Sequence, residues 1–307
     1  MSDNTLMGVI CINKHEGVTS HTIVNMVRRL YNTKQVGHTG TLDPMATGVL
    51  PVMVGRAVKA SEYLTAEDKG YIAEMKLGII TDTGDITGNI ISQNSNTPSY
   101  EEVKEAVNCF IGNIKQTPPM YSALKVNGQK LVDLARKGIE VERNARDIFI
   151  KDIKLEQVYN SNSEYRLAVE CSKGTYIRTL CTDIGEKLGC GAVMTKLSRT
   201  KSGGFDIKNS YTIQQLEEMT EEERIKLLRP IDLLFSDIDE VILPPFFERL
   251  ARCGVEIYLK KIGISPNDAP ENTRFKLCGA NGFFALGEVR SFPDGMAIKP
   301  IKQFVIK

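Results

Sequence analysis

The stretch Gly37-His38-Thr39-Gly40-Thr41-Leu42-Asp43-Pro44-Met45-Ala46-Thr47-Gly48-Val49-Leu50 is the part of the sequence around which the chain is organised. Three glycines, three threonines and a proline disfavour both a helix and a regular strand, because glycine is conformationally free and proline lacks a backbone donor. The stretch is therefore predicted to be a loop. Asp43 is the only carboxylate between Glu16 and Glu62, and its small neighbours would let a ligand approach closely. We interpret Asp43 as a candidate nucleophile.

A second interpretation of the same residues is structural. Leu42-Asp43-Pro44 is also a common turn sequence, in which the aspartate bonds its own backbone and the proline fixes the next dihedral angle. The local pattern leaves both interpretations open, so the rest of the chain has to distinguish them.

Size and composition indicate a globular protein with one large domain and an appendage. The chain has 307 residues, of which 42% are apolar and 25% charged, which is ordinary for a soluble protein. No apolar run approaches the roughly 18 residues that would span a bilayer. The first residues, Met1 to Thr5, carry neither a basic region nor a long apolar stretch, so we expect no secretory signal and a cytoplasmic protein.

The metal-binding and redox residue types occur without a recognisable spacing. The seven cysteines are scattered and include no Cys-x-x-Cys pair, although disulfide frameworks and zinc sites need closer, paired spacing. The three histidines lie in the first 40 residues, with no acid or cysteine at a ligand spacing. We expect reduced thiols and no metal.

The pattern of apolar residues predicts an α+β fold. Residues 71–77 alternate as a half-buried strand does, and residues 176–188 form a helix whose first turn carries Arg178. The apolar run 49–54 is interrupted by Pro51, so we expect a short or edge strand there. One helix is predicted over residues 211–228. Because strands and helices do not alternate cleanly, a parallel doubly wound sheet is unfavourable.

Two parts of the chain differ from this core. Residues 116–147 are basic and rich in turns, and we interpret them as an excursion from the sheet. Beyond about residue 234 the pattern changes to short strands with glycine turns, which predicts a small β module. We therefore divide the chain into residues 1–235 and 236–307.

The net charge of +1 argues against a chain that coats nucleic acid indiscriminately, but local basic patches remain. Runs of charge are usually solvated faces; as candidate contacts to an RNA backbone we select Lys125, Lys130, Arg136, Arg143, Arg146 and Arg199.

The single carboxylate, Asp43, favours some reaction classes over others. A lone carboxylate argues against two-carboxylate hydrolysis of sugars, and the nucleotide P-loop sequence is absent. An aspartyl-phosphate enzyme stays open as an alternative, although its acid should precede a Thr-Gly-Thr-Leu run, whereas Asp43 follows Gly40-Thr41-Leu42. A carboxylate can also act on a nucleoside if it stays ionised, and a nearby guanidinium favours the ionised form. Arg178 is the candidate partner.

Five blocks, in order, resemble the bacterial tRNA pseudouridine-55 synthases. They span about Gly8 to Gly203 and are Gly37-His38-Thr39-Gly40-Thr41-Leu42-Asp43-Pro44, Asp68-Lys69-Gly70-Tyr71, Met120-Tyr121-Ser122-Ala123-Leu124-Lys125, Arg136-Lys137-Gly138-Ile139-Glu140-Val141 and Cys171-Ser172-Lys173-Gly174-Thr175-Tyr176-Ile177-Arg178. Five ordered blocks are far more specific than any one of them.

The resemblance implies a pseudouridine synthase fold, with a mixed, mainly antiparallel sheet flanked by helices and a C-terminal β-rich, PUA-like module. It implies isomerisation of one uridine in the T-arm loop of tRNA, without cofactor or metal, and we expect a monomer. By position, the resemblance gives Asp43 as the catalytic aspartate, Arg178 as its ion-pair partner, His38 as the histidine that holds the flipped nucleotide, Tyr71 as the tyrosine stacked on the base, and Tyr176 and Leu197 as walls of the uridine pocket.

The residue types suit that chemistry. Replacing a carbon–nitrogen glycosidic bond by a carbon–carbon bond requires the base to detach, rotate and reattach, so the nucleotide must leave its stack. Tyr71 offers an aromatic face for the base and is a candidate to help remove the proton. A second hypothesis is an RNA-binding or tRNA-folding factor whose isomerase activity is dispensable, because it would use the same basic patches.

Overall fold

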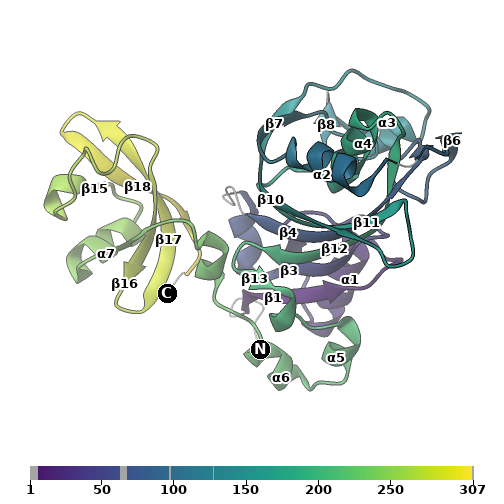
Figure 1. The fold of residues 1–307 in the computed structure, drawn as a ribbon. Helices are drawn as coiled ribbons and strands as arrows, with labels where there is room; N and C mark the ends of the chain where they lie inside the picture. Colours follow the sequence, from purple (N-terminus) through teal and green to yellow (C-terminus); the bar gives the residue numbers. More distant parts are fainter. Residues whose placement is uncertain (1–5, 63–67, 97, 127, 306–307) are drawn as a thin grey trace.

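The computed structural model describes residues 6–62, 68–96, 98–126 and 128–305. Within them the chain forms two large sheets, one built from the first two thirds of the sequence and one from the C-terminal part (Figure 1).

The larger sheet has nine strands. They are β1 (Met7–Lys14), β2 (Val36–His38), β3 (Thr47–Gly55), β4 (Lys69–Leu77), β7 (Gly112–Gln116), β10 (Arg146–Gln157), β11 (Glu164–Cys171), β12 (Ala192–Ser202) and β13 (Phe205–Asp206). Seven of them run in the order β1-β3-β12-β4-β11-β10-β7, with β2 paired to β3 and β13 to β12. The pairing of β12 with β3 is parallel and the other pairings are antiparallel. The predicted α+β fold with a mixed, mainly antiparallel sheet is confirmed.

The two elements that carry most of the expected site form where the sequence predicts them. On β4 the side chains of Tyr71, Ala73, Met75 and Leu77 are buried on one face of the sheet. The helix α4 (Ile177–Lys187) begins directly after Tyr176 and buries apolar side chains that pack against β12 and β4.

Helices cover the sheet and share one hydrophobic core with it. α1 (Ser20–Leu30), capped by the Thr19 side chain, packs on β2 and β3, while α2 (Tyr100–Asn108) packs on β10 and α4. The single-turn and shorter elements are η1 (Arg56–Glu62), β5 (Ile79–Thr81), β6 (Ile90–Gln93), η2 (Ile207–Asn209), α5 (Ile213–Glu217), α6 (Glu221–Lys226) and η3 (Ile231–Phe235). The core buries apolar residues of α1, α2, α4 and α5 together with those of the sheet.

Two local expectations are wrong. Residues 211–228 form two helices, α5 and α6, because Thr212 and Thr220 each begin a helix with a capping box. The strand that contains Pro51 lies inside the sheet. The Pro51 carbonyl accepts from the Thr39 N–H, on the side of β3 that faces β2 and β12. The nitrogen and the carbonyl of one strand residue point to the same side. The proline nitrogen, which has no hydrogen, therefore faces the gap between β2 and β12, where no neighbouring strand needs a donor.

The basic excursion leaves the sheet at β7 and returns at β10, and these two strands are neighbours. Gln116 pairs with Arg146 at the base. Between them lie the short strands β8 (Lys125–Val126) and β9 (Gln129–Lys130) and the helix α3 (Leu131–Ala135). The excursion therefore starts and ends at the β7 edge of the sheet, with its two ends tied into the ladder.

The second sheet forms the C-terminal module, set beside the larger sheet in Figure 1. Its strands, in the order β14-β16-β17-β18-β15, are β14 (Glu240–Ile242), β16 (Arg274–Gly279), β17 (Gly282–Phe292), β18 (Gly295–Gln303) and β15 (Ile257–Tyr258), with helices α7 (Pro245–Arg252) and η4 (Leu259–Lys261). Phe283 and Phe304 of this module pack on Phe235, with ring centroids 5.8 Å apart in each pair. An apolar contact thus joins the module to the rest of the chain.

Candidate active site

A cavity of about 320 Å³ lies where the Asp43 loop meets β4, β12 and the start of α4. Six residues selected from the sequence line it: Asp43, Tyr71, Tyr176, Arg178, Leu197 and Arg199. They come from segments that are far apart in the sequence, and the fold brings them to one place.

The loop that carries Asp43 is held by hydrogen bonds on both sides of the aspartate. The Ser20 hydroxyl donates to the Leu42 carbonyl (3.0 Å) and accepts from the Leu42 N–H (2.8 Å). The Lys14 ammonium, which is fully buried, donates to the Pro44 carbonyl (3.2 Å) and to two other carbonyls. Burial lowers the pKa of Lys14 to about 8, and Asp43 opposes that change. The carboxylate thus projects into the cavity from a fixed backbone.

The Arg178 guanidinium meets Asp43 in the cavity. Its Nε lies 3.1 Å from Oδ2 of Asp43, and only 6% of the arginine side chain is exposed against 36% for the aspartate. Arg178 also donates to the Thr83 carbonyl (3.1 Å) and to the Tyr121 carbonyl (2.7 Å). The partner that the sequence predicted for Asp43 is therefore in place and fixed from three directions.

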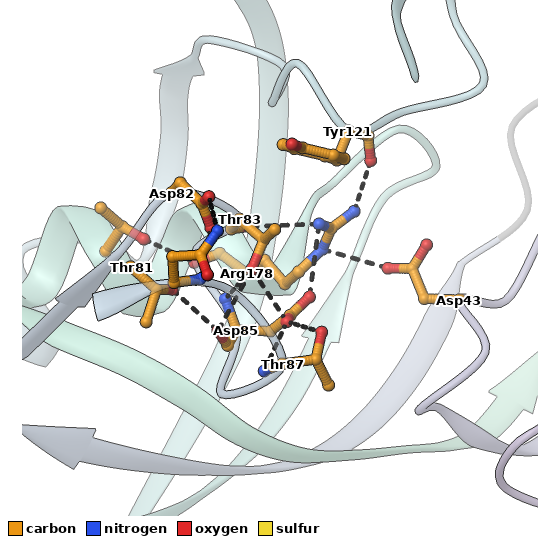
Figure 2. A network of polar contacts seen from close by, with 10 residues as sticks. Asp43, Thr81, Asp82, Thr83, Asp85, Thr87, Tyr121 and Arg178 are labelled. Atoms are coloured by element: carbon orange, nitrogen blue, oxygen red, sulfur yellow. Dashed lines mark hydrogen bonds and ion pairs between the residues drawn. The ribbon is translucent and has the colours of Figure 1, made fainter. Parts of the chain in front are cut away.

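A second carboxylate, Asp85, contacts a different nitrogen of the same guanidinium (Figure 2). Its Oδ2 is 3.5 Å from Nη1 of Arg178, and its Oδ1 accepts from the Thr83 hydroxyl (2.9 Å) and from the N–H and hydroxyl of Thr87. Asp85 is 5% exposed. The residue was not predicted from the sequence. In the sequence, Asp85 stands in a run of polar turn residues after β5. Nothing in that run indicates a contact with Arg178, which is 93 residues later.

The environment of Asp43 acts on its ionisation in two directions. Burial raises the pKa of Asp43 above the ordinary aspartate value, and the negative charge of Asp85 adds to that rise. The Arg178 guanidinium, and more weakly Lys14, oppose it. The carboxylate is therefore more basic than a free aspartate, and the Arg178 guanidinium limits how far burial disfavours its ionised form.

Tyr71 and Arg199 lie together at the base of the cavity. Burial raises the pKa of the Tyr71 hydroxyl, and the Arg199 guanidinium opposes the rise. Arg199 is 1% exposed, and it donates to the carbonyls of Val49 (2.7 Å) and Gly40 (3.2 Å). This placement corrects the expectation of a surface contact to RNA: the side chain is enclosed because it holds the two ends of the Asp43 loop.

Leu197 and Tyr176 also line the cavity, and their role as walls of a uridine pocket stays a prediction. Leu197 lies on β12, where it pairs in register with Ala73 of β4. Tyr176 is the residue at the N-terminus of α4, and both its backbone N–H and its carbonyl bond the buried side chain of Gln116. Lys69, which the sequence marks only as part of a motif, also lines the cavity.

His38 lies on β2 next to the loop but is not among the residues that line the cavity. Burial lowers its pKa, and Arg199 and His21 add to that effect. Its Nδ1 is buried and has no hydrogen-bond partner among the described residues. The role of His38 in holding a nucleotide stays a prediction.

The candidate RNA contacts of the excursion are distributed over its surface. Lys125, Lys130, Arg136 and Arg146 are exposed. Arg143 is half-buried and donates to the Pro118 carbonyl (3.2 Å) and to Glu140 (3.1 Å), so it supports the excursion itself.

The described residues contain neither a metal-ligand cluster nor a membrane-spanning helix. Among them, no cluster of three or more His, Cys, Asp or Glu side chains has the arrangement of a metal site. No helix in the same residues has the length and apolar character needed to cross a membrane.

The sequence matches two family profiles that together cover more than half of it. Residues 28–177 match the N-terminal domain of the TruB family pseudouridylate synthases, and residues 178–244 match the C-terminal domain of tRNA pseudouridylate synthase B. The chain belongs to the TruB family of pseudouridylate synthases.

Relatives within the TruB family match over most of their length. The chain is 40% identical over 301 residues to tRNA pseudouridine synthase B of Clostridioides difficile, covering 97% of this chain and 99% of that one. It is 47% identical over 250 residues to the protein of the same name from Clostridium acetobutylicum, covering 81% and 85%.

The fold is also found in solved structures. The protein resembles a chain in the crystal structure of a Cbf5-Nop10-Gar1 complex, with a TM-score of 0.76, 24% identity, and coverage of 98% of this chain and 86% of the other. At this identity the likeness shows the fold, and it extends over both sheets of the TruB-family chain.

Proposed function

We propose that the chain converts a uridine in the T-arm loop of tRNA to pseudouridine, with Asp43 as the catalytic residue. The observation that carries this proposal is the meeting of Asp43, Arg178 and Tyr71 in one cavity. Membership of the TruB family supports the reaction, and the names of the relatives support tRNA as the substrate.

The cavity has the chemistry that the isomerisation needs. A uridine that leaves its stack loses a few kcal/mol of stacking and pairing, and a stack on the Tyr71 ring returns about 1 to 3 kcal/mol. Leu197 gives the base an apolar wall that lets it rotate without leaving. Asp43, paired with Arg178, lines the cavity that would receive the nucleotide, so its carboxylate can reach a ribose or base carbon there. The reaction is an isomerisation, so its atoms balance without a second substrate.

The specificity for a folded loop is proposed to come from outside the cavity. RNA loops present phosphates and splayed bases, and we propose that the exposed cations of the excursion, Lys125, Lys130, Arg136 and Arg146, contact them. We propose that residues 1–235 carry the reaction and that the module of residues 236–307 adds further RNA contacts. We further propose a monomer that acts in the cytoplasm; light scattering after size exclusion tests the monomer.

The decisive experiment measures release of tritium from carbon 5 of uridine in a T-arm stem-loop. The wild-type chain should release it, and Asp43→Asn should not, while a filter-binding assay finds RNA affinity largely retained. Turnover by Asp43→Asn would reject the role of Asp43.

Two alternatives are tested by the same variant. A tRNA-folding factor would refold misfolded tRNA equally well with Asn at position 43, and the basic excursion is the observation that keeps this function in view. An aspartyl-phosphate enzyme would give a magnesium-dependent labelled adduct on Asp43. That alternative is weakened because the buried acid nearest to Asp43 in the network, Asp85, is separated from it by the Arg178 guanidinium.

A further inference from the structure

Gln116, the last residue of β7, forms hydrogen bonds with both backbone groups of Tyr176, the residue just before α4. The Tyr176 N–H donates to Oε1 of Gln116 (2.7 Å), and Nε2 of Gln116 donates to the Tyr176 carbonyl (3.0 Å). Gln116 is 2% exposed. A single side-chain amide therefore reproduces the paired contacts of a β-ladder, between segments 60 residues apart in the sequence.

These two bonds fix the position of the first turn of α4. The Tyr176 carbonyl also accepts the first hydrogen bond of the helix, from the Leu180 N–H (3.0 Å). Tyr176 has an extended backbone, and its own side chain makes no capping bond there. The amide of Gln116 thus anchors the N-terminal end of α4, and Arg178 is the second residue of that helix.

The same segment reaches Arg178 directly. The Tyr121 carbonyl, five residues after Gln116, accepts from Nη2 of Arg178 (2.7 Å). Gln116 therefore holds the backbone of Tyr176, and the Tyr121 carbonyl holds the side chain of Arg178, two residues further along the chain. Both belong to the first residues of the basic excursion, whose base is closed where Arg143 donates to the Pro118 carbonyl.

We propose that Gln116 is a positioning residue for the reaction, which ties the base of the excursion to Tyr176 and so sets the place of Arg178 against Asp43. The inference rests on the proposed function. Gln116 itself lies outside the residues that line the cavity, so it acts through the helix. RNA that binds the excursion would then act on the same segment that holds Arg178, which couples recognition to the geometry of the reacting acid.

The test compares Gln116→Met, which keeps volume and removes both hydrogen bonds, with Gln157→Met. Gln157 is a matched control, because it lies exposed at the end of β10 and its amide makes one bond to the Ser161 carbonyl. We expect kcat of Gln116→Met to fall by about 10²-fold, the loss typical of a displacement of about 1 Å at a reacting group. Its Kd for the T-arm stem-loop should stay within about threefold, and the control should match wild type in both.

A pH profile separates positioning from a general structural role. The charged groups that face Asp43 are Arg178, Asp85 and Lys14. When the helix end is released, Arg178 stabilises the ionised aspartate less, so the acid limb of the kcat profile should move to higher pH. Gln116→Glu keeps the acceptor for the Tyr176 N–H, but it sets a buried carboxylate oxygen against the Tyr176 carbonyl, so its kcat should fall at least as far as that of Gln116→Met.

Asp43→Asn is assayed beside these variants. An active Asp43→Asn defeats the proposed function, whereas an inactive Asp43→Asn with full kcat in Gln116→Met defeats only the role of Gln116. Lost RNA affinity at unchanged kcat, or failure of both Gln116 variants to fold, would also overturn the positioning role.

Discussion

Asp85 and Asp43 contact different nitrogens of the Arg178 guanidinium: Oδ2 of Asp85 lies 3.5 Å from Nη1, and Oδ2 of Asp43 lies 3.1 Å from Nε. Because Asp85 is itself held by Thr83 and Thr87, the arginine cannot turn away from the cavity without breaking several bonds. The ion pair of Asp43 with Arg178 is thus the more exposed end of a longer buried network (Figure 2).

Replacing Asp85 by Asn should reduce kcat by about 10-fold to 10²-fold, because Arg178 loses a charged partner and its orientation loosens. The same change removes a negative charge that raises the pKa of Asp43, so the acid limb of activity should move to lower pH. Single-turnover rates across pH measure both effects. Asp82→Asn is the control, since Asp82 is exposed in the same loop and bonds Asn89; an equal loss there would contradict the assignment.

Replacing Arg178 by Lys should nearly abolish activity although the charge is kept. The guanidinium serves Asp43, Asp85 and two carbonyls at once, and an ammonium has neither the fork nor the reach to do so. With the opposing charge displaced, the pKa of Asp43 should rise further, and residual activity should disappear at a higher pH than in wild type. Rates within threefold of wild type would show that charge alone suffices.

Asp43→Asn should make the folded chain more stable at neutral pH. Because the pKa of Asp43 is raised in the folded state, the folded state binds a proton more tightly than the unfolded one. The aspartate's contribution is therefore present below its unfolded pKa and lost as the pH rises through its folded pKa. The melting temperature of Asp43→Asn should exceed that of wild type at pH 7, and the difference should vanish as the pH falls below the unfolded value. A lower melting temperature at pH 7 would mean that the ion pair with Arg178 outweighs burial.

Arg199→Met should lower the free energy of unfolding by about 2 to 4 kcal/mol, because it leaves the buried carbonyls of Val49 and Gly40 without a donor. Urea denaturation measures the loss. Lys201→Met is the matched change, since Lys201 is an exposed cation on the same strand, and it should shift stability by less than about 0.5 kcal/mol. Equal effects would show that Arg199 does not clamp the loop.

Changing Lys125, Lys130 or Arg136 to Gln should weaken binding of the T-arm stem-loop. Each change should also reduce the slope of log Kd against log salt by about one for every phosphate that the variant no longer neutralises. All three residues are exposed on the excursion. Lys226→Gln on α6, at the far end of the larger sheet in Figure 1, should change neither quantity. An unchanged salt dependence in the excursion variants would remove these residues from the RNA-binding surface.

The parts of the site that the sequence predicted are those with a local signal. The alternation over residues 71–77 places Tyr71 on the buried face, and the start of the helix at residue 177 places Arg178 in its first turn. Asp43 stands out as one acid in a loop of small residues. In each case a few neighbouring residues determine what the backbone does.

The parts that the sequence did not reveal depend on contacts between distant segments. Arg199 follows Lys196 in a basic stretch that looks solvated. The alternation of β12 puts Arg199 on the same face as Leu197 and Lys196 on the other face, and contacts with the distant Asp43 loop enclose Arg199 while Lys196 stays exposed. Asp85 lies in a polar turn, and only the packing of that turn against α4 makes it a partner of Arg178. Pro51 suggested an edge strand because proline has no N–H for a sheet hydrogen bond. The sequence of one strand does not show that this position faces a gap between two neighbouring strands, β2 and β12.

The place of β12 between β3 and β4 has a consequence for biosynthesis. Strands β3 and β4 are complete by residue 77, yet the strand that joins them begins at Ala192. A ribosome-bound chain would therefore carry two unsatisfied strand edges through the translation of more than a hundred further codons, and such edges invite aggregation. The cavity lacks two of its lining residues until Leu197 and Arg199 have been synthesised, so it is completed late in translation.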